Sequence, residues 1–165
     1  MSYRNKTYVI FDGDSDINNY YLMKAWKNNK NIDFDFHDAH ELNTLTNRSQ
    51  EENTKRKLRE RFSSAKQAIV LIGESTKNLY QFVRWEIEVC QALDLPIVGA
   101  NLNGEIDYDA SRCPPILKYA DAVFVSFRPK IIKHALDNFC GNYSKYKGQG
   151  KNWSYNKSVY EGLGL

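Results

Sequence analysis

One carboxylate occupies an unusual position in the stretch Asn78–Leu95, "NLYQFVRWEIEVCQALDL". Apolar residues recur there at spacings of three and four, which predicts a helix with one apolar stripe, because successive helical side chains are turned by about 100°. Glu86 falls in the middle of that stripe, whereas Glu88 is expected on the opposite, solvent-facing side. The stripe is defined by Leu79, Phe82, Val83, Cys90 and Leu93. A carboxylate in a partly apolar pocket can hold a sugar hydroxyl or stabilise a cationic transition state, so Glu86 is a candidate catalytic group.

An ion pair is the alternative explanation for Glu86. Half-buried charges in proteins are usually paired, and the sequence offers Arg59, Arg61 and Arg84 as partners. The spacing alone leaves the catalytic and the ion-paired readings open.

Small polar residues follow the predicted strands and define a second group of candidates. Ligands of open α/β sheets bind outside the carboxyl ends of the strands, so these residues would form one rim. Glu86 lies about two turns into the helix that leaves this rim and can point toward it. The rim contains Asp12, Gly13, Asp14, Ser15, His37, Asp38, His40, Gly73, Glu74, Ser75, Thr76, Asn101 and Asn103. Turn and cap formation by the aspartates, and solvation of the histidines, are the structural alternatives.

The elements that must position these residues alternate between strand and helix. Short apolar runs predict strands at 7–11, 33–36, 68–73, 96–102 and 122–127. Amphipathic segments predict helices at 17–29, 49–65, 78–95 and 129–139. This alternation predicts an α/β fold with right-handed crossovers, a flavodoxin-like, doubly wound five-stranded parallel sheet.

The chain divides into a predicted α/β domain at 1–140 and a C-terminal extension at 141–165. The segment 103–119 has no clean helical periodicity and is expected to be irregular. The extension is rich in Gly, Lys, Asn and Tyr, and the sequence does not decide between a flexible tail and an aromatic-anchored wrap.

The composition limits the classes of partner that we expect for this protein. The 165 residues suit one domain, and the net charge of +3 is too small to indicate a nucleic-acid partner. No apolar run approaches the roughly 20 residues of a membrane span, and the N-terminus lacks a signal-peptide pattern. Cys90, Cys113 and Cys140 form no C-x-x-C pair, which predicts reduced thiols in a cytoplasm and no metal site.

Several enzyme classes lack their signatures in this sequence. The phosphate-binding patterns G-x-x-x-x-G-K-[ST] and G-x-G-x-x-G are missing, as is the nucleophile elbow G-x-S-x-G. A response-regulator receiver needs an aspartate at the end of the third strand, where this chain has "IGES". A P-loop NTPase, a Rossmann dehydrogenase, an α/β-hydrolase and a receiver are therefore disfavoured.

Four segments together carry a family resemblance. They are "TYVIFDGD", "DFHDAHELN", "KRKLRERFSSAKQAIVLIGESTKNLYQFVRWEIEVC" and "LDLPIVGANLNG". Over about residues 7–139 the chain resembles the TIR-like domains of bacterial Thoeris anti-phage defence proteins (ThsB-like). TIR domains carry the pattern W-x-x-x-E, and "FVRWE" at 82–86 matches it with Phe82 in place of Trp. The glutamate of that pattern is the same Glu86 that the apolar stripe indicates.

The resemblance implies an enzyme that consumes NAD as a substrate and holds no permanent cofactor. Catalytic TIR domains break the bond between nicotinamide and ribose, and Thoeris TIR proteins make a cyclic ADP-ribose isomer or an ADP-ribose conjugate. That diffusible nucleotide activates a separate effector. The resemblance assigns catalysis to Glu86. The substrate-binding residues expected with it are Phe11, Asp12, Gly13, Asp38, His40, Asn43, Ser75 and Phe82.

Other readings of the same resemblance remain. Many TIR domains only assemble, so a non-catalytic interaction module is one alternative. A nucleoside deoxyribosyltransferase-like enzyme, which shares the topology and uses a glutamate on a sugar, is another. The NAD reading also leaves room for a homo-oligomer, because TIR domains often build composite sites between subunits, and it requires neither nucleic acid nor membrane.

Overall fold

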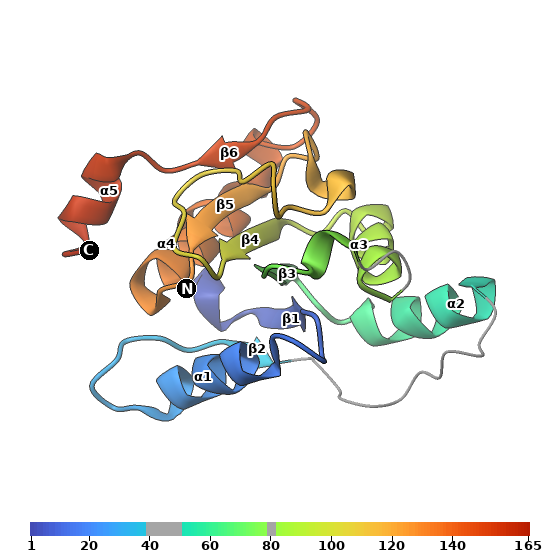
Figure 1. The fold of residues 1–165 in the computed structure, drawn as a ribbon, viewed down its shortest axis with the longest axis horizontal. Coiled ribbons are helices and arrows are strands. Elements are labelled where there is room, and N and C mark those ends of the chain that lie inside the picture. The colour runs from blue at the N-terminus through green and yellow to red at the C-terminus, as the bar shows by residue number, and fades with distance from the viewer. Residues whose placement is uncertain (39–50, 79–81) are drawn as a thin grey trace.

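The computed structural model describes residues 1–38, 51–78 and 82–165 (Figure 1). Its strands form one parallel sheet in the order β2-β1-β3-β4-β5-β6. The strands are β1 Lys6–Ile10, β2 His37–Asp38, β3 Gln67–Ile72, β4 Ile97–Asn101, β5 Val123–Ser126 and β6 Trp153–Ser154. The predicted flavodoxin-like α/β class is confirmed, and the C-terminal extension adds the two-residue strand β6 beside β5.

Helices connect the strands of the sheet. The α-helices are α1 Ile17–Asn28, α2 Glu51–Phe62, α3 Phe82–Ala92, α4 Pro129–Asn138 and α5 Lys157–Gly162. The short 3-10 helices are η1 Ser2–Arg4, η2 Thr76–Asn78, η3 Pro115–Leu117 and η4 Cys140–Lys145. No helix in the described part of the chain is both long and apolar enough to cross a bilayer.

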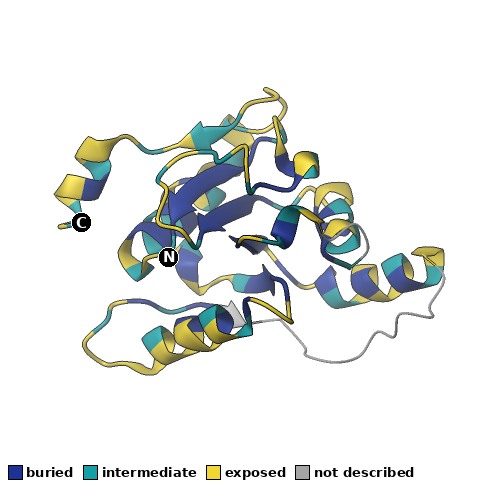
Figure 2. Cartoon of the chain, in the orientation of Figure 1, coloured by how far each residue is buried: buried dark blue, intermediate teal, exposed yellow. Residues whose placement is uncertain are grey.

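The sheet separates two hydrophobic cores. In β3, Ile69 and Leu71 join the core shared with α1 and α4, whereas Val70 and Ile72 join the core shared with α2 and α3. Successive side chains of a strand point to opposite faces, so a strand covered on both faces must be apolar throughout. Figure 2 shows this as buried central strands with exposed residues on the outer sides of the helices.

The second strand lies later than the sequence predicts. Its expected span was 33–36, but pairing occurs at His37–Asp38, opposite Lys6 and Thr7 of β1. Extending this parallel register backward would place 33–36 beside η1, whose helical backbone offers no edge to a strand. Phe34 and Phe36 are buried without being strand residues.

The C-terminal extension is anchored to the sheet by one buried aspartate. Asp121, directly before β5, accepts the backbone N–H groups of Gly148 at 2.8 Å, Gln149 at 3.1 Å and Lys151 at 2.9 Å. Trp153 in β6 packs edge-on against Tyr146, with 4.9 Å between ring centroids. The extension therefore wraps the β5 edge of the sheet, as Figure 1 shows.

Candidate functional site

Glu86 lies in the second turn of α3, on the side that faces β1. The Tyr8 hydroxyl of β1 forms a hydrogen bond with its carboxyl group, and Arg61 of α2 is close enough to interact electrostatically. Tyr8 itself packs edge-on against Phe62, with ring centroids 3.9 Å apart. The Glu86 Oε2 atom is buried and has no hydrogen-bond partner within the described chain. The residue as a whole is half-buried, and its Oε2 atom points inward, as the apolar stripe predicts.

Burial changes the acid strength of this carboxyl group. Removal from water raises the pKa of Glu86 to about 8, against the lowering effects of the Arg61 charge and the Tyr8 hydrogen bond. Burial, and then the Glu86 charge, raise the pKa of Tyr8, which therefore stays protonated and able to donate. At neutral pH the free protein holds Glu86 largely neutral.

Glu88, two residues after Glu86 on α3, forms two ion pairs. Its carboxylate contacts Arg84 Nε at 2.8 Å and Lys55 Nζ of α2 at 2.5 Å. The predicted solvent-facing position of Glu88 is wrong, because its side chain is only 25% exposed and lies at the α2–α3 contact. Of the predicted partners of Glu86, Arg84 is engaged by Glu88 instead, whereas the charge of Arg61 acts electrostatically on Glu86.

The loop after β1 meets the end of β3 through a second carboxyl group. Asp16 is buried, and a Cβ atom placed on Gly73 would lie 2.4 Å from Asp16 Oδ2. Thr76 Oγ1 accepts the Gly73 N–H at 2.8 Å and lies 3.4 Å from Asp16 Oδ2. Burial, and then the nearby Asp12, raise the pKa of Asp16. The sequence predicts that Asp16 or Ser15 caps the following helix. Asp16 takes that position, but its side chain makes no capping hydrogen bond.

The predicted residues of the β1 loop have different roles in the structure. Asp12 Oδ1 accepts the N–H groups of Asp14 at 3.0 Å and Ser15 at 3.3 Å, which is the turn geometry of the structural alternative. Phe11 stacks on Tyr20, with centroids 4.8 Å apart, in the core on the α1 side of the sheet. That side is opposite to the core that contains the Tyr8 and Ile87 side chains.

Other predicted site residues lie nearer the surface. Gly13 is exposed, and a Cβ there would meet no atom within 4 Å. Ser75 is half-buried after β3, and the half-buried Phe82 packs edge-on against Trp85 at 5.6 Å. The side chain of Asp38, together with His40 and Asn43, lies outside the described part of the structure.

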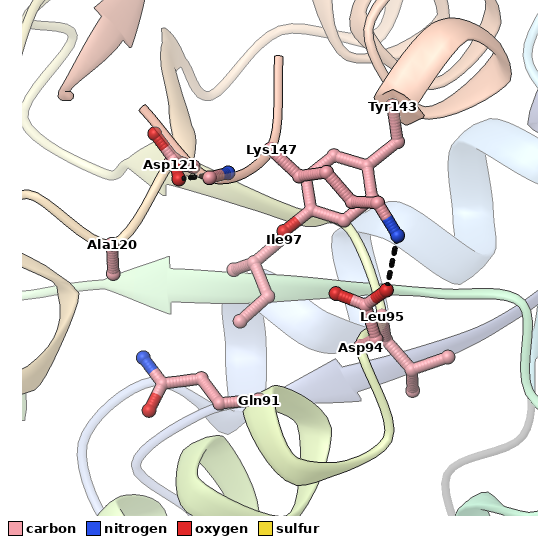
Figure 3. Close-up of a pocket in the computed structure, with 9 residues that line it drawn as sticks. Gln91, Asp94, Leu95, Ile97, Ala120, Asp121, Tyr143 and Lys147 are labelled. Atoms are coloured by element: carbon pink, nitrogen blue, oxygen red, sulfur yellow. Dashed lines mark hydrogen bonds and ion pairs between the residues drawn. The ribbon is translucent and has the colours of Figure 1, made fainter. Parts of the chain in front are cut away.

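A cavity of about 530 Å³ lies at the amino ends of β4 and β5, away from Glu86 (Figure 3). Lys147 Nζ contacts Asp94 Oδ2 at 2.6 Å across it, and the Tyr143 ring forms part of its wall. Its polar lining residues hold the C-terminal extension in place. The Asp121 carboxylate, for example, already accepts backbone N–H groups of that extension. A smaller cavity of about 210 Å³ is lined by residues of the β5–α4 junction and α5.

Comparison with known proteins identifies the family. Residues 8–107 match the family described as "Thoeris protein ThsB, TIR-like domain". This chain belongs to that family. The Thoeris match spans most of β1 through the loop after β4 and includes Glu86, so the resemblance stated from the sequence is confirmed. Residues 108–165, with β5, α4 and the extension, lie beyond it.

Other comparisons add little to the Thoeris assignment. No curated protein matches the chain. A solved structure titled "Crystal structure of conserved protein from Enterococcus faecalis V583" aligns with 16% identity over 98% of each chain, at a TM-score of 0.44. Membership of the ThsB TIR-like family places the protein among Thoeris defence proteins.

Proposed function

We propose that this Thoeris protein cleaves the nicotinamide–ribose bond of NAD, with Glu86 as the catalytic carboxylate. The released ADP-ribosyl group becomes a signalling nucleotide, either a cyclic ADP-ribose isomer or an ADP-ribose conjugate. One observation carries the proposal. Glu86 is half-buried, its carboxyl group forms a hydrogen bond with Tyr8, and its Oε2 atom is buried without a hydrogen-bond partner in the described chain.

The chemistry of NAD suits a single carboxylate. The nicotinamide ring is cationic in NAD and departs as a neutral pyridine, so the leaving group needs no proton from a general acid. Its departure leaves positive charge on the ribose, as in the oxocarbenium-like transition states of glycoside hydrolysis. A carboxylate held in a site of low polarity stabilises such a charge more strongly than one in water.

The raised pKa of Glu86 fits this role once substrate is present. Burial favours the neutral carboxyl group in the free protein, with a pKa of about 8. A cationic nicotinamide riboside brought beside it favours the ionised form, because opposite charges within a few ångströms lower the pKa of an acid. Substrate binding would then generate the catalytic anion where it is used.

The test is nicotinamide release from NAD by purified protein, with and without lysate of phage-infected cells, and with products identified by mass spectrometry. Glu86→Gln is expected to abolish release, since the amide cannot carry the negative charge. Glu88→Gln is the matched control on the same helix and should keep activity. For the wild type, kcat/KM is expected to rise as the pH approaches 8, because that ratio reports ionisation of the free enzyme.

Two outcomes would contradict the proposal. Full nicotinamide release by Glu86→Gln removes the carboxylate from catalysis. Consumption of deoxynucleosides in place of NAD, in parallel reactions, would favour the deoxyribosyltransferase alternative. Absence of turnover by the wild type under all these conditions would favour the non-catalytic interaction module.

A further inference from the structure

The smaller cavity combines hydroxyl groups and positive charges at the end of β5. It has a volume of about 210 Å³ and lies where α5 of the C-terminal extension covers the start of α4. Ser126 is the last residue of β5, and Tyr160 belongs to α5. Both residues line the cavity, and they are only 1% and 6% exposed.

The two hydroxyl groups are arranged as donors. The Ser126 N–H donates to the Tyr160 hydroxyl oxygen at 3.1 Å, which leaves the phenol proton for another acceptor. Ser126 Oγ lies near the same phenol, yet it is buried and makes no hydrogen bond of acceptable geometry within the described residues. A buried hydroxyl without a partner is uncommon, because its desolvation is uncompensated.

Two positively charged residues line the same cavity. Arg128 is the N-cap residue of the ten-residue helix α4, and Lys157 is the first residue of α5. Both line the cavity and are exposed, against one acidic lining residue, Glu161. The N-terminal end of α4 adds the partial positive charge of a helix terminus. Residues with hydroxyl, guanidinium and ammonium groups therefore line one space, and the negative charge of Asp107 also acts on Tyr160.

We propose that this cavity binds a small oxyanion, namely a phosphate group. Phosphate oxygens accept hydrogen bonds from hydroxyls and pair with arginine and lysine, which matches the donors present. The volume equals that of about seven liquid waters at roughly 30 Å³ each, which accommodates one phosphate group and a short attached fragment. Burial raises the pKa of Tyr160, so its hydroxyl stays protonated as a donor.

The site is independent of the proposed NAD chemistry. Ser126 and Tyr160 belong to the part of the chain beyond residue 107, outside the family match. Tyr160 packs in the core on the α1 and α4 side of the sheet, whereas Ile87, next to Glu86, packs in the opposite core. Because Lys157 and Tyr160 come from the extension, a bound phosphate would tie that extension to the end of β5.

The experiment is calorimetric titration of the full chain at constant ionic strength. Inorganic phosphate, ribose 5-phosphate and acetate are titrated separately, which distinguishes free phosphate from a phosphate ester and from a carboxylate. Saturable binding of one equivalent of phosphate or of the ester is expected. Arg128→Gln and Ser126→Ala should each weaken it by about tenfold, the loss expected for one charge-assisted or buried hydrogen bond.

Lys145→Gln is the control, because Lys145 is an exposed lysine of the same extension that does not line the cavity. Its affinity should equal that of the wild type. The proposal is overturned if neither phosphate compound saturates the protein, or if Lys145→Gln weakens binding as much as Arg128→Gln. Unchanged affinity in Ser126→Ala would also overturn it, since that hydroxyl is the buried donor on which the site depends.

Discussion

Two glutamates on α3, two residues apart, are placed in opposite electrostatic environments. Burial raises the pKa of Glu86 to about 8, whereas hydrogen bonds first from Lys55 and then from Arg84 lower the pKa of Glu88. The inward position of Glu86 could be predicted from helical periodicity. The pairing of Glu88 with Lys55 could not, because it depends on how α2 packs against α3, and helical periodicity gives no information on such contacts between elements.

The ionisation of Glu86 should make the folded state less stable at higher pH. Its pKa is about 8 when folded and about 4.5 in the unfolded chain, so between these values the unfolded state loses the proton that the folded state keeps. Wild-type stability should therefore fall as pH rises from 4.5 to about 8. Glu86→Gln removes this dependence, and its stability relative to wild type should increase by about 3 kcal/mol between pH 5 and 7.5.

Urea denaturation at pH 5, 6, 7 and 7.5 measures this effect. Glu88→Gln is the control, because removing an ion pair that is favourable above its lowered pKa should weaken, and not strengthen, the folded state at pH 7.5. An identical pH dependence in Glu86→Gln and wild type would show that the buried carboxyl group is not the source.

The sequence predicted the bounds of the strands better than the contacts between the elements. The strands β1, β3, β4 and β5 begin and end within a residue or so of the predicted ranges, because each is a continuous apolar run. The second strand was misplaced, because its position depends on where β1 begins. The close approach of α1 to β3 at Gly73 also escaped prediction, since it joins residues far apart in the sequence.

That approach gives a prediction for the β3–α1 contact. Gly73→Ala would place a methyl group 2.4 Å from the Asp16 carboxylate, so the loop before α1 must shift, at a cost of about 1–3 kcal/mol. In an Asp16→Ala background the obstructing carboxylate is gone, and Gly73→Ala should cost markedly less. Thermal or urea unfolding of the four proteins of this double-mutant cycle measures the coupling.

Gly13→Ala is the matched control for that cycle, since a Cβ there meets no atom within 4 Å. Its stability should stay within about 0.5 kcal/mol of wild type. Equal costs of Gly73→Ala in both backgrounds would mean that Asp16 does not constrain the end of β3.

At the scale of the whole molecule, the sheet separates two candidate sites. Tyr8, the hydrogen-bond partner of Glu86, packs with α2 and α3 on one face, and the proposed phosphate cavity is closed by the C-terminal extension beside α4. The sequence could not decide whether that extension is ordered. Its attachment depends on Asp121, whose acceptors meet N–H groups about thirty residues later, and no local pattern records such a contact.

The extension should detach when its anchor is removed. Burial alone would raise the pKa of Asp121. The backbone N–H groups of Lys151 and its neighbours outweigh that effect and lower the pKa, so the carboxylate is ionised and accepts their hydrogen bonds. Asp121→Ala leaves three N–H groups without this acceptor and puts alanine at φ 57°. We expect the free energy of unfolding to fall by about 2 kcal/mol or more, with faster hydrogen exchange confined to 146–165 and the central strands still protected.

Asp121→Asn is the control. Asparagine tolerates this φ and keeps one acceptor oxygen, so it should release the extension less. Equal exchange rates in Asp121→Ala and wild type would show that β6 and the aromatic packing of Trp153 hold the extension without the aspartate, because those contacts are the ones that remain.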